Sequence, residues 1–174
     1  TNDLTSIGLA ASGSGNIPAF TAINSGTSPV IATITVTPTF ENGGVSCTGP
    51  ATPFEITVNP TAQVNPTVDM VVTDGDNVDI PFSTINTGGT STYTWTNTDP
   101  TTGLTNTGSS DIGFTAVNTG TSPITTTVVV TPTFENGGNS NSGPTDTFII
   151  TVNPTAQIDP IDSLIFCDED VVDP

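Results

Sequence analysis

The chain has 174 residues, of which 17 are Asp or Glu and none is Lys, Arg or His, so its formal net charge is −17. Nucleic-acid binding needs Lys and Arg to displace counterions from phosphates, so this composition excludes that class of function. It also argues against anionic membrane surfaces, and no apolar run is long enough to insert across a bilayer.

The first strong structural signal along the chain is a strand over residues 31–40. Because successive side chains of a strand point to opposite faces, a period of two in hydrophobicity predicts a half-buried strand. Residues 54–58 show the same alternation. The side chains predicted to face inward are Ala32, Ile34, Val36, Pro38, Phe40, Phe54, Ile56 and Val58.

Later segments carry further strand signals, separated by Asn-Gly-Gly turns at 42–44 and 136–138 that accept positive φ. A single Trp at position 95 lies in an alternating pattern typical of a core residue. Six or seven short strands around one buried Trp predict an all-β, immunoglobulin-like sandwich. Pro132 inside a strand predicts an edge strand or a bulge. The predicted strands span 68–73, 78–84, 91–97, 112–118, 123–134 and 145–153, with Val128, Val130, Pro132 and Phe134 inward.

The chain repeats itself at a constant offset of 94 residues, and such a period indicates a tandem architecture. Three separate motifs and three pairs of phenylalanines keep this offset. The motifs are TPTFENGG at 37–44 and 131–138, TVNPTAQ at 57–63 and 151–157, and FTAINSGTSP at 20–29, which returns as FTAVNTGTSP at 114–123.

The repeat predicts a domain organisation. Residues 1–66 form the C-terminal part of one repeat, 67–160 a complete repeat of about 94 residues, and 161–174 the first strand of a third. The chain is therefore expected to be a window from a longer protein. Pro60 and Pro66 bracket a junction without a flexible Gly/Ser run, which predicts a semi-rigid connection and a rod-like array.

Two cysteines, Cys47 and Cys167, are candidates for disulfides with partners outside the chain. Their equivalents in the complete repeat are Asn141 and Thr73, so both thiols are missing from the same repeat. This pattern is expected if the two positions form a disulfide within one repeat and the complete repeat has lost both of its cysteines together. Disulfides imply an oxidising exterior. The alternative is two unrelated, buried free thiols.

Several motifs resemble the PKD-like/HYR-like repeats of giant, SprB-type gliding-motility adhesins of Bacteroidota. They are TSIGLAASGSGNIPAFTA, ATITVTPTF followed by NGGVSCTG, and ITVNPTAQVNP. The resemblance implies tandem PKD-like β-sandwiches in a long extracellular filament on the cell surface, exported by type IX secretion and used for attachment. Typical repeats have a Val-Val-Cys-Asn-Gly-like first strand; Phe166-Cys167-Asp168 keeps its Cys, whereas Val72-Thr73-Asp74 departs from it.

An acidic loop and a serine are the candidate ligand and modification sites. Asp74, Asp76 and Asp79 lie around a Gly in TDGDNVD, a spacing that can offer oxygen ligands to Ca²⁺. The EF-hand pattern is incomplete, so an acidic solvated turn without any cofactor is the favoured interpretation. Asp162-Ser163-Leu164 is similar to the Asp-Ser/Thr-apolar O-glycosylation signal of Bacteroidota, which makes Ser163 a candidate.

The composition leaves little material for catalysis. Without His, Lys or Arg there is no imidazole base, no Schiff-base amine and no guanidinium group for an oxyanion. A pair of carboxylates drawn from Asp99, Asp111, Glu135 and Asp146 is the remaining chemical option. These four fall at turns or strand ends, where solvation is the ordinary explanation, so the chain is predicted not to be an enzyme.

The predicted function is a structural and adhesive stalk repeat of an extracellular surface protein, whose first partners are neighbouring repeats of its own chain. The alternatives are a polysaccharide-binding module and an S-layer or matrix lattice protein, and surface polysaccharide or other surface proteins would then be partners. Exposed aromatic rings usually stack on sugars, whereas the one Trp and one Tyr lie in core-like alternation.

Overall fold

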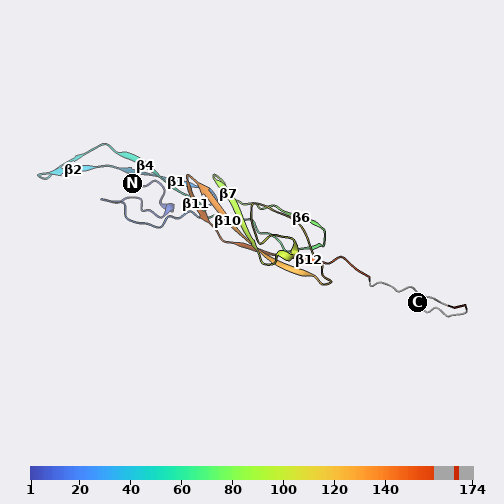
Figure 1. The fold of residues 1–174 in the computed structure, drawn as a ribbon. Coiled ribbons are helices and arrows are strands. Elements are labelled where there is room, and N and C mark those ends of the chain that lie inside the picture. The colour runs from blue at the N-terminus through green and yellow to red at the C-terminus, as the bar shows by residue number, and fades with distance from the viewer. Residues whose placement is uncertain (159–166, 169–174) are drawn as a thin grey trace.

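The computed structural model describes residues 1–158 and 167–168, and these form mostly β-strands with almost no helix. The all-β prediction is confirmed. The chain forms two successive units, which follow one another along the length of the molecule (Figure 1). Ser163 and most of the segment 161–174 lie outside the described residues. No helix in the described part of the chain is long and apolar enough to cross a membrane.

The first unit, residues 1–58, is built from two antiparallel pairs, β1 with β4 and β2 with β3. Its core consists of Ile7, Leu9, Ala32, Ile34 and Val58. Its elements are η1 (Thr5–Ile7), β1 (Val30–Val36), β2 (Thr39–Asn42), β3 (Val45–Thr48) and β4 (Thr52–Val58).

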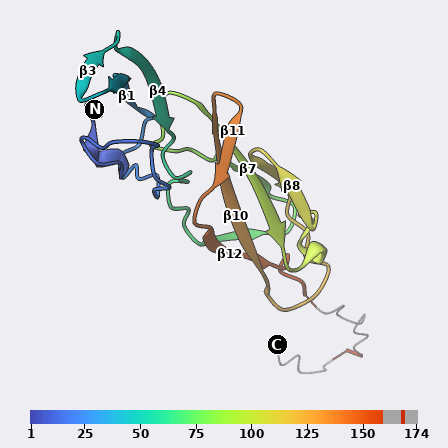
Figure 2. The same cartoon turned by 90° about the vertical axis from the view of Figure 1, so that its left-hand side faces the viewer.

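The second unit, residues 67–158, has a large sheet in the order β5-β12-β10-β7-β8, with β11 also paired to β10, and a small sheet of β6 and β9. Only β5 runs parallel to its neighbour, β12. Figure 2 shows β10 passing along the unit between β7 and β12. The elements are β5 (Met70–Thr73), β6 (Asn77–Ile80), β7 (Thr90–Asn97), η2 (Pro100–Thr102), β8 (Thr107–Ser109), β9 (Ile112–Thr115), β10 (Ile124–Asn136), β11 (Asn139–Ser142) and β12 (Asp146–Asn153).

The core of the second unit lies where the sequence places it. Trp95, Val130 and Ile150 are buried, and β10 alternates between buried and less buried side chains along almost its whole length. The indole Nε1 of Trp95 donates to the carbonyl of Ser110 at 3.2 Å, so its polar atom is paired. The inward prediction for Val128, Val130, Pro132 and Phe134 is confirmed.

Several predicted strand boundaries are wrong. The strand predicted for 31–40 is divided, because β1 ends at Val36 and β2 begins at Thr39, on either side of Pro38. The strand predicted for 78–84 ends at Ile80, where Pro81 removes an amide donor. The strands β8 and β11 were not predicted, since their sequences, Thr-Gly-Ser and Asn-Ser-Asn-Ser, have no apolar alternation.

Of the two alternatives predicted for Pro132, the edge strand is wrong, because β10 lies inside the sheet between β7 and β12. The bulge alternative is not contradicted, since residues 131–132 of β10 face three residues, 143–145, between β11 and β12. Pairing with β12 ends at Val130, and pairing with β11 begins at Thr133. The carbonyl of Pro132 accepts from the amide of Gly143 at 3.0 Å. The nitrogen of Pro132 is on the same side of the strand as this carbonyl, so it faces the gap between β12 and β11. A missing amide therefore interrupts no ladder at that point.

The two units share a set of side-chain hydrogen bonds at Asn24 and Asn118, which are 94 residues apart. Asn24 and Asn118 each donate through Nδ2 to two carbonyls, one four residues later and one at the end of the last strand of the unit. Their Oδ1 atoms accept from Gly26 and Gly120. The carbonyls are those of Ser28 and Val58 for Asn24, and of Ser122 and Val152 for Asn118, at 2.7–2.9 Å.

Four side chains predicted to face inward in the first unit, Val36, Pro38, Phe40 and Phe54, are exposed, and for these the prediction is wrong. Val36 is 49% exposed, Phe40 71% and Phe54 42%. The alternation does place them on one face. In the described part of the chain, however, no strand in the first unit takes the place of β7 beside β10 or of the small sheet of β6 and β9 that faces it.

We predict that Gly108→Ala destabilises the second unit by about 1–3 kcal/mol, the usual cost of overpacking a core. A Cβ at position 108 would overlap the Trp95 ring, whereas a Cβ at Gly113 meets no atom within 4 Å. Urea unfolding of Gly108→Ala, with Gly113→Ala as the matched control, measures this difference. Equal stabilities of the two variants would contradict the packing argument.

Candidate functional site

The contact between the two units is the most elaborate polar site in the described structure. The linker, residues 59–67, has the sequence Asn-Pro-Thr-Ala-Gln-Val-Asn-Pro-Thr and follows directly on β4. It lies against the second unit, to which several of its polar groups are hydrogen-bonded.

Asparagine side chains hold the start of the linker against the hairpin of β10 and β11. Asn59 donates through Nδ2 to the carbonyls of Asn136, at 3.0 Å, and Asn139, at 3.4 Å. Its Oδ1 accepts from Nδ2 of Asn136 at 3.0 Å. Asn141 donates through Nδ2 to the carbonyl of Pro60 at 3.1 Å. The side-chain amide of Asn59 thus uses both its donor and its acceptor.

Small side chains allow the linker to lie close to the second unit. Pro60 is fully buried, and Ala62 is 1% exposed. A Cβ at Gly143 would overlap the carbonyl of Ala62, so any larger residue at position 143 would push the linker away. The junction therefore depends on close backbone approach as well as on hydrogen bonds.

Asn86 connects three segments at once. Its Oδ1 accepts from the amide of Gln63 at 2.7 Å, and its Nδ2 donates to the carbonyls of Thr61, at 3.2 Å, and Thr27, at 3.4 Å. Asn86 is 8% exposed, so these bonds are largely shielded from water. The neighbouring Thr87 amide donates to the same Thr27 carbonyl at 2.9 Å. One carboxamide thus ties the first unit, the linker and the second unit together.

The end of the linker is fixed by two further pairs. Asn65 bonds Ser83 twice, through its amide to the carbonyl and through Nδ2 to Oγ. The amide and the hydroxyl of Thr67 both donate to Oδ2 of Asp146, at 2.7 and 2.6 Å. Asp146 is the one carboxylate among these junction contacts, and it takes part as a hydrogen-bond acceptor.

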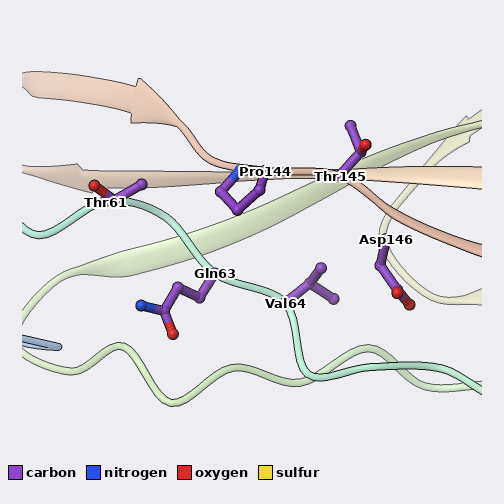
Figure 3. Close-up of a pocket in the computed structure, with 6 residues that line it drawn as sticks. All are labelled: Thr61, Gln63, Val64, Pro144, Thr145 and Asp146. Atoms are coloured by element: carbon purple, nitrogen blue, oxygen red, sulfur yellow. The ribbon is translucent and has the colours of Figure 1, made fainter.

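A hollow of about 250 Å³ lies between the linker and the segment that joins β11 to β12. Figure 3 shows Thr61, Gln63 and Val64 on the linker side and Pro144, Thr145 and Asp146 on the other. The hollow contains one carboxyl group, and that group already accepts two hydrogen bonds from Thr67. The lining offers no base or nucleophile pair, so its chemistry is that of a packing gap at the junction.

The second copy of the linker motif provides an internal comparison. TVNPTAQ recurs at 151–157, but Ala156 is exposed where Ala62 is buried. Pro154 is half-buried, whereas Pro60 is fully buried. The burial of Pro60 and Ala62 therefore results from contact with the second unit and not from the motif itself.

The acidic loop does not gather its three candidate ligands. Asp74 accepts at Oδ1 from the Asn118 amide and at Oδ2 from the Thr155 hydroxyl, and Asp76 accepts at Oδ2 from the Thr73 amide. Asp79 lies on β6, outside this hydrogen-bonded turn. Among the described residues there is no group of three or more Asp, Glu, His or Cys side chains that could hold a metal ion.

Other acidic side chains also act as local hydrogen-bond acceptors. Asp111 accepts from the Phe82 amide at 2.8 Å. Asp99 caps η2, and the hydroxyl and amide of Thr101 lower the pKa of its carboxyl group. The stability that the ionised Asp99 carboxyl group contributes is fully present above its ordinary pKa and is lost as the pH falls through its lowered pKa. Burial raises the pKa of Tyr93.

The structure bears on the pairing of the cysteines. In the second unit the equivalent positions, Asn141 and Thr73, are at opposite ends of the sheet: Asn141 pairs with Phe134, near one end of β10, and Thr73 pairs with the last residue of β12, near the other. At about 3.3 Å per residue, roughly ten residues of β10 separate them by about 30 Å. A disulfide needs Cα atoms within about 7 Å, so the predicted pairing of these two positions within one repeat is wrong.

The cysteines remain candidates for partners outside the chain. Both Cys47 and Cys167 are exposed, so the alternative of two buried thiols is also wrong. Cys47 lies on the exposed strand β3, which pairs with β2.

Sequence reasoning predicted a semi-rigid junction from Pro60 and Pro66, but not the residues that form it. Asn59 and Asn136 are 77 positions apart, and Asn86 contacts Thr27 across 59 positions. The only sequence signal was the repetition of Asn and Pro in both copies of the motif. Comparison of the chain with protein-family models and with curated proteins gives no match.

We predict that Asn59→Ala loosens the junction, because it removes three hydrogen bonds between the linker and the β10–β11 hairpin. Residual dipolar couplings should then require a wider distribution of orientations between the two units. Asn153→Ala is the matched control, since it changes the same Asn of the motif at the other copy. If the two variants gave the same distribution, the asparagine contacts would not hold the units.

We predict that Ca²⁺ leaves the Tm of the chain unchanged, because the carboxylates of Asp74 and Asp76 already accept hydrogen bonds within the turn. Calorimetric titration and thermal unfolding with Ca²⁺ or with a chelator test this. A heat of binding accompanied by a rise in Tm, both abolished by Asp74→Asn, would establish a calcium site instead.

Proposed function

We propose that the chain is part of a stalk: tandem, immunoglobulin-like (PKD-like) sandwiches of an extracellular surface filament that holds an adhesive region away from the cell. The observation that carries this proposal is the junction. A connection with a buried proline and a buried Asn86 transmits orientation from one unit to the next, whereas a flexible linker would not.

The domain organisation belongs to the same proposal. The facing sheets of the second unit, with Trp95 between them, support an immunoglobulin-like sandwich for 67–160. The hydrogen bonds that Asn24 and Asn118 share support a related partial unit in 1–66. By its sequence, 161–174 would begin a third.

The charge of the chain favours the same function. Seventeen acidic side chains without a cationic one repel each other, which opposes collapse of successive units onto one another and keeps an array extended. Neutral carboxamides make several contacts of the junction, and these hydrogen bonds do not depend on opposite charges. Export by type IX secretion, a surface location and a role in gliding or attachment are the parts of the proposal that rest on the resemblance of the motifs.

Electron microscopy of the parent protein on cells tests the proposal, with thin rods as the expected result. A planar lattice would favour an S-layer or matrix protein instead. A glycan array with the isolated second unit tests the binding alternative, and reproducible binding to a polysaccharide would displace the stalk function. We expect no binding, because Trp95, the only Trp, is 6% exposed.

We predict that small-angle scattering of the chain gives an elongated particle whose maximum dimension hardly changes between low and high salt. The physical reason is that the junction contains no ion pair and one carboxylate, so screening by salt has little to weaken. A marked contraction at high salt would show that charge repulsion alone, and not the junction, keeps the units apart.

A further inference from the structure

The turn between β10 and β11 has a chemically reactive sequence. Asn136 precedes Gly137 and Gly138, whose φ angles are +62° and +76°, and a Cβ at either glycine would meet no atom within 4 Å. Asn is among the thermally labile residues. The amide nitrogen of the next residue can attack its carboxamide carbon, and a Gly there has no side chain to hinder the attack. Among the described residues the Gly137 amide makes no hydrogen bond, so its nitrogen is accessible.

The Asp74-Gly75 turn of the same unit shows how such a pair can be held on both sides. The Gly75 amide donates to the carbonyl of Ala116 at 2.8 Å, so its nitrogen is not available for attack. Both carboxylate oxygens of Asp74 also accept hydrogen bonds, one from an amide and one from a hydroxyl group. Gly137 has no such restraint, so the reactivity of the Asn136-Gly137 pair depends on what holds the side chain of Asn136.

The contact with the linker holds this side chain. Nδ2 of Asn136 donates to Oδ1 of Asn59 at 3.0 Å, and the carbonyl of Asn136 accepts from Nδ2 of Asn59 at 3.0 Å. Asn136 is half-buried in this docked arrangement, whereas Asn42, in the same Asn-Gly-Gly turn of the first unit, is exposed. The attack requires the carboxamide carbon to turn onto the Gly137 nitrogen, and the hydrogen bonds to Asn59 oppose this movement.

We propose that Asn136, beside Gly137 and hydrogen-bonded to Asn59, is a site of spontaneous deamidation whose rate is controlled by docking of the linker. The Gly137 nitrogen forms a bond to Cγ of Asn136, the bond from Cγ to Nδ2 breaks, and Nδ2 leaves as ammonia with the proton from the Gly137 amide. Water then opens the five-membered succinimide ring and leaves Asp or isoaspartate at position 136. No electrons are exchanged, and water is the only co-reactant.

The product cannot make the contact that restrained the reactant. A carboxylate has no proton for Oδ1 of Asn59, so two acceptor oxygens would face each other where one hydrogen bond now lies. The product also adds a negative charge to a chain with a net charge of −17. Opening of the junction thus allows a reaction after which the same contact cannot form again, and the conversion is a one-way step to a looser junction. This inference does not depend on the proposed stalk function.

The test is ageing of the whole folded chain at mildly alkaline pH, followed by proteolysis after Glu41 and Glu135 and mass spectrometry of the peptides. These peptides begin at Asn42 and Asn136, and the change from amide to acid alters the mass of each one separately. We expect Asn136 to convert about fivefold or more slowly than Asn42, because hydrogen bonds hold its side chain in most molecules. Equal rates at the two sites would overturn the proposal.

Two variants of the linker motif make the test specific. Asn59→Ala removes the restraint, so Asn136 should then convert at nearly the rate of Asn42. Asn153→Ala, the same substitution at the other copy of the motif, is the matched control and should leave the rate at Asn136 unchanged. If Asn136 stayed intact in Asn59→Ala after Asn42 had converted, the turn would not be reactive and the proposal would fail.

A third pair of variants tests the consequence for the junction. Asn136→Asp carries the product side chain, and residual dipolar couplings should show a wider distribution of orientations between the units than in the unmodified chain. Asn42→Asp adds the same charge in the equivalent turn of the first unit and should leave the distribution unchanged. The same distribution in both variants would overturn the one-way loosening of the junction.

Discussion

Hydrogen bonds from asparagine carboxamides to backbone carbonyls are the interaction on which this structure depends. The chain has no cationic side chain, so carbonyl groups at the crossings between segments need neutral donors. A carboxamide has two donor hydrogens and an acceptor oxygen, which lets Asn86 or Asn118 join three segments at one point. Carboxylates act only as acceptors, and hydroxyl groups and amides supply their protons.

The sequence was sufficient to predict which side chains are buried in strands that another part of the chain covers. Along β10 and β12 the period of two matches the buried positions because the small sheet of β6 and β9 covers that face. The same period in β1 and β2 predicted Val36 and Phe40 to be inward, and both are exposed. A local pattern identifies which side chains share a face, but it contains no information on whether another segment covers them.

The junction and the cysteines show the same limit at longer range. Pro60 and Pro66 restrict the linker locally, and this part was predictable from the sequence. The contact of Asn59 with Asn136 depends on how two units are placed, and no local signal encodes it. The prediction of a disulfide used the positions of the cysteines in the repeat. Whether a disulfide can form depends on the distance between the two positions along β10, which the register of β10, β11 and β12 defines.

The small size of the junction side chains has a consequence for how an array of such units can form. Proline, alanine and asparagine bury little apolar area, so two separate units would gain little free energy by associating. Covalent connection changes this balance, because it makes docking intramolecular and raises the effective concentration of each partner surface. Ala62 is buried beside a following unit while Ala156 in the same motif is exposed. Order at the junction therefore comes from chain connectivity acting together with a few directed hydrogen bonds, and it needs neither a large hydrophobic interface nor ion pairs.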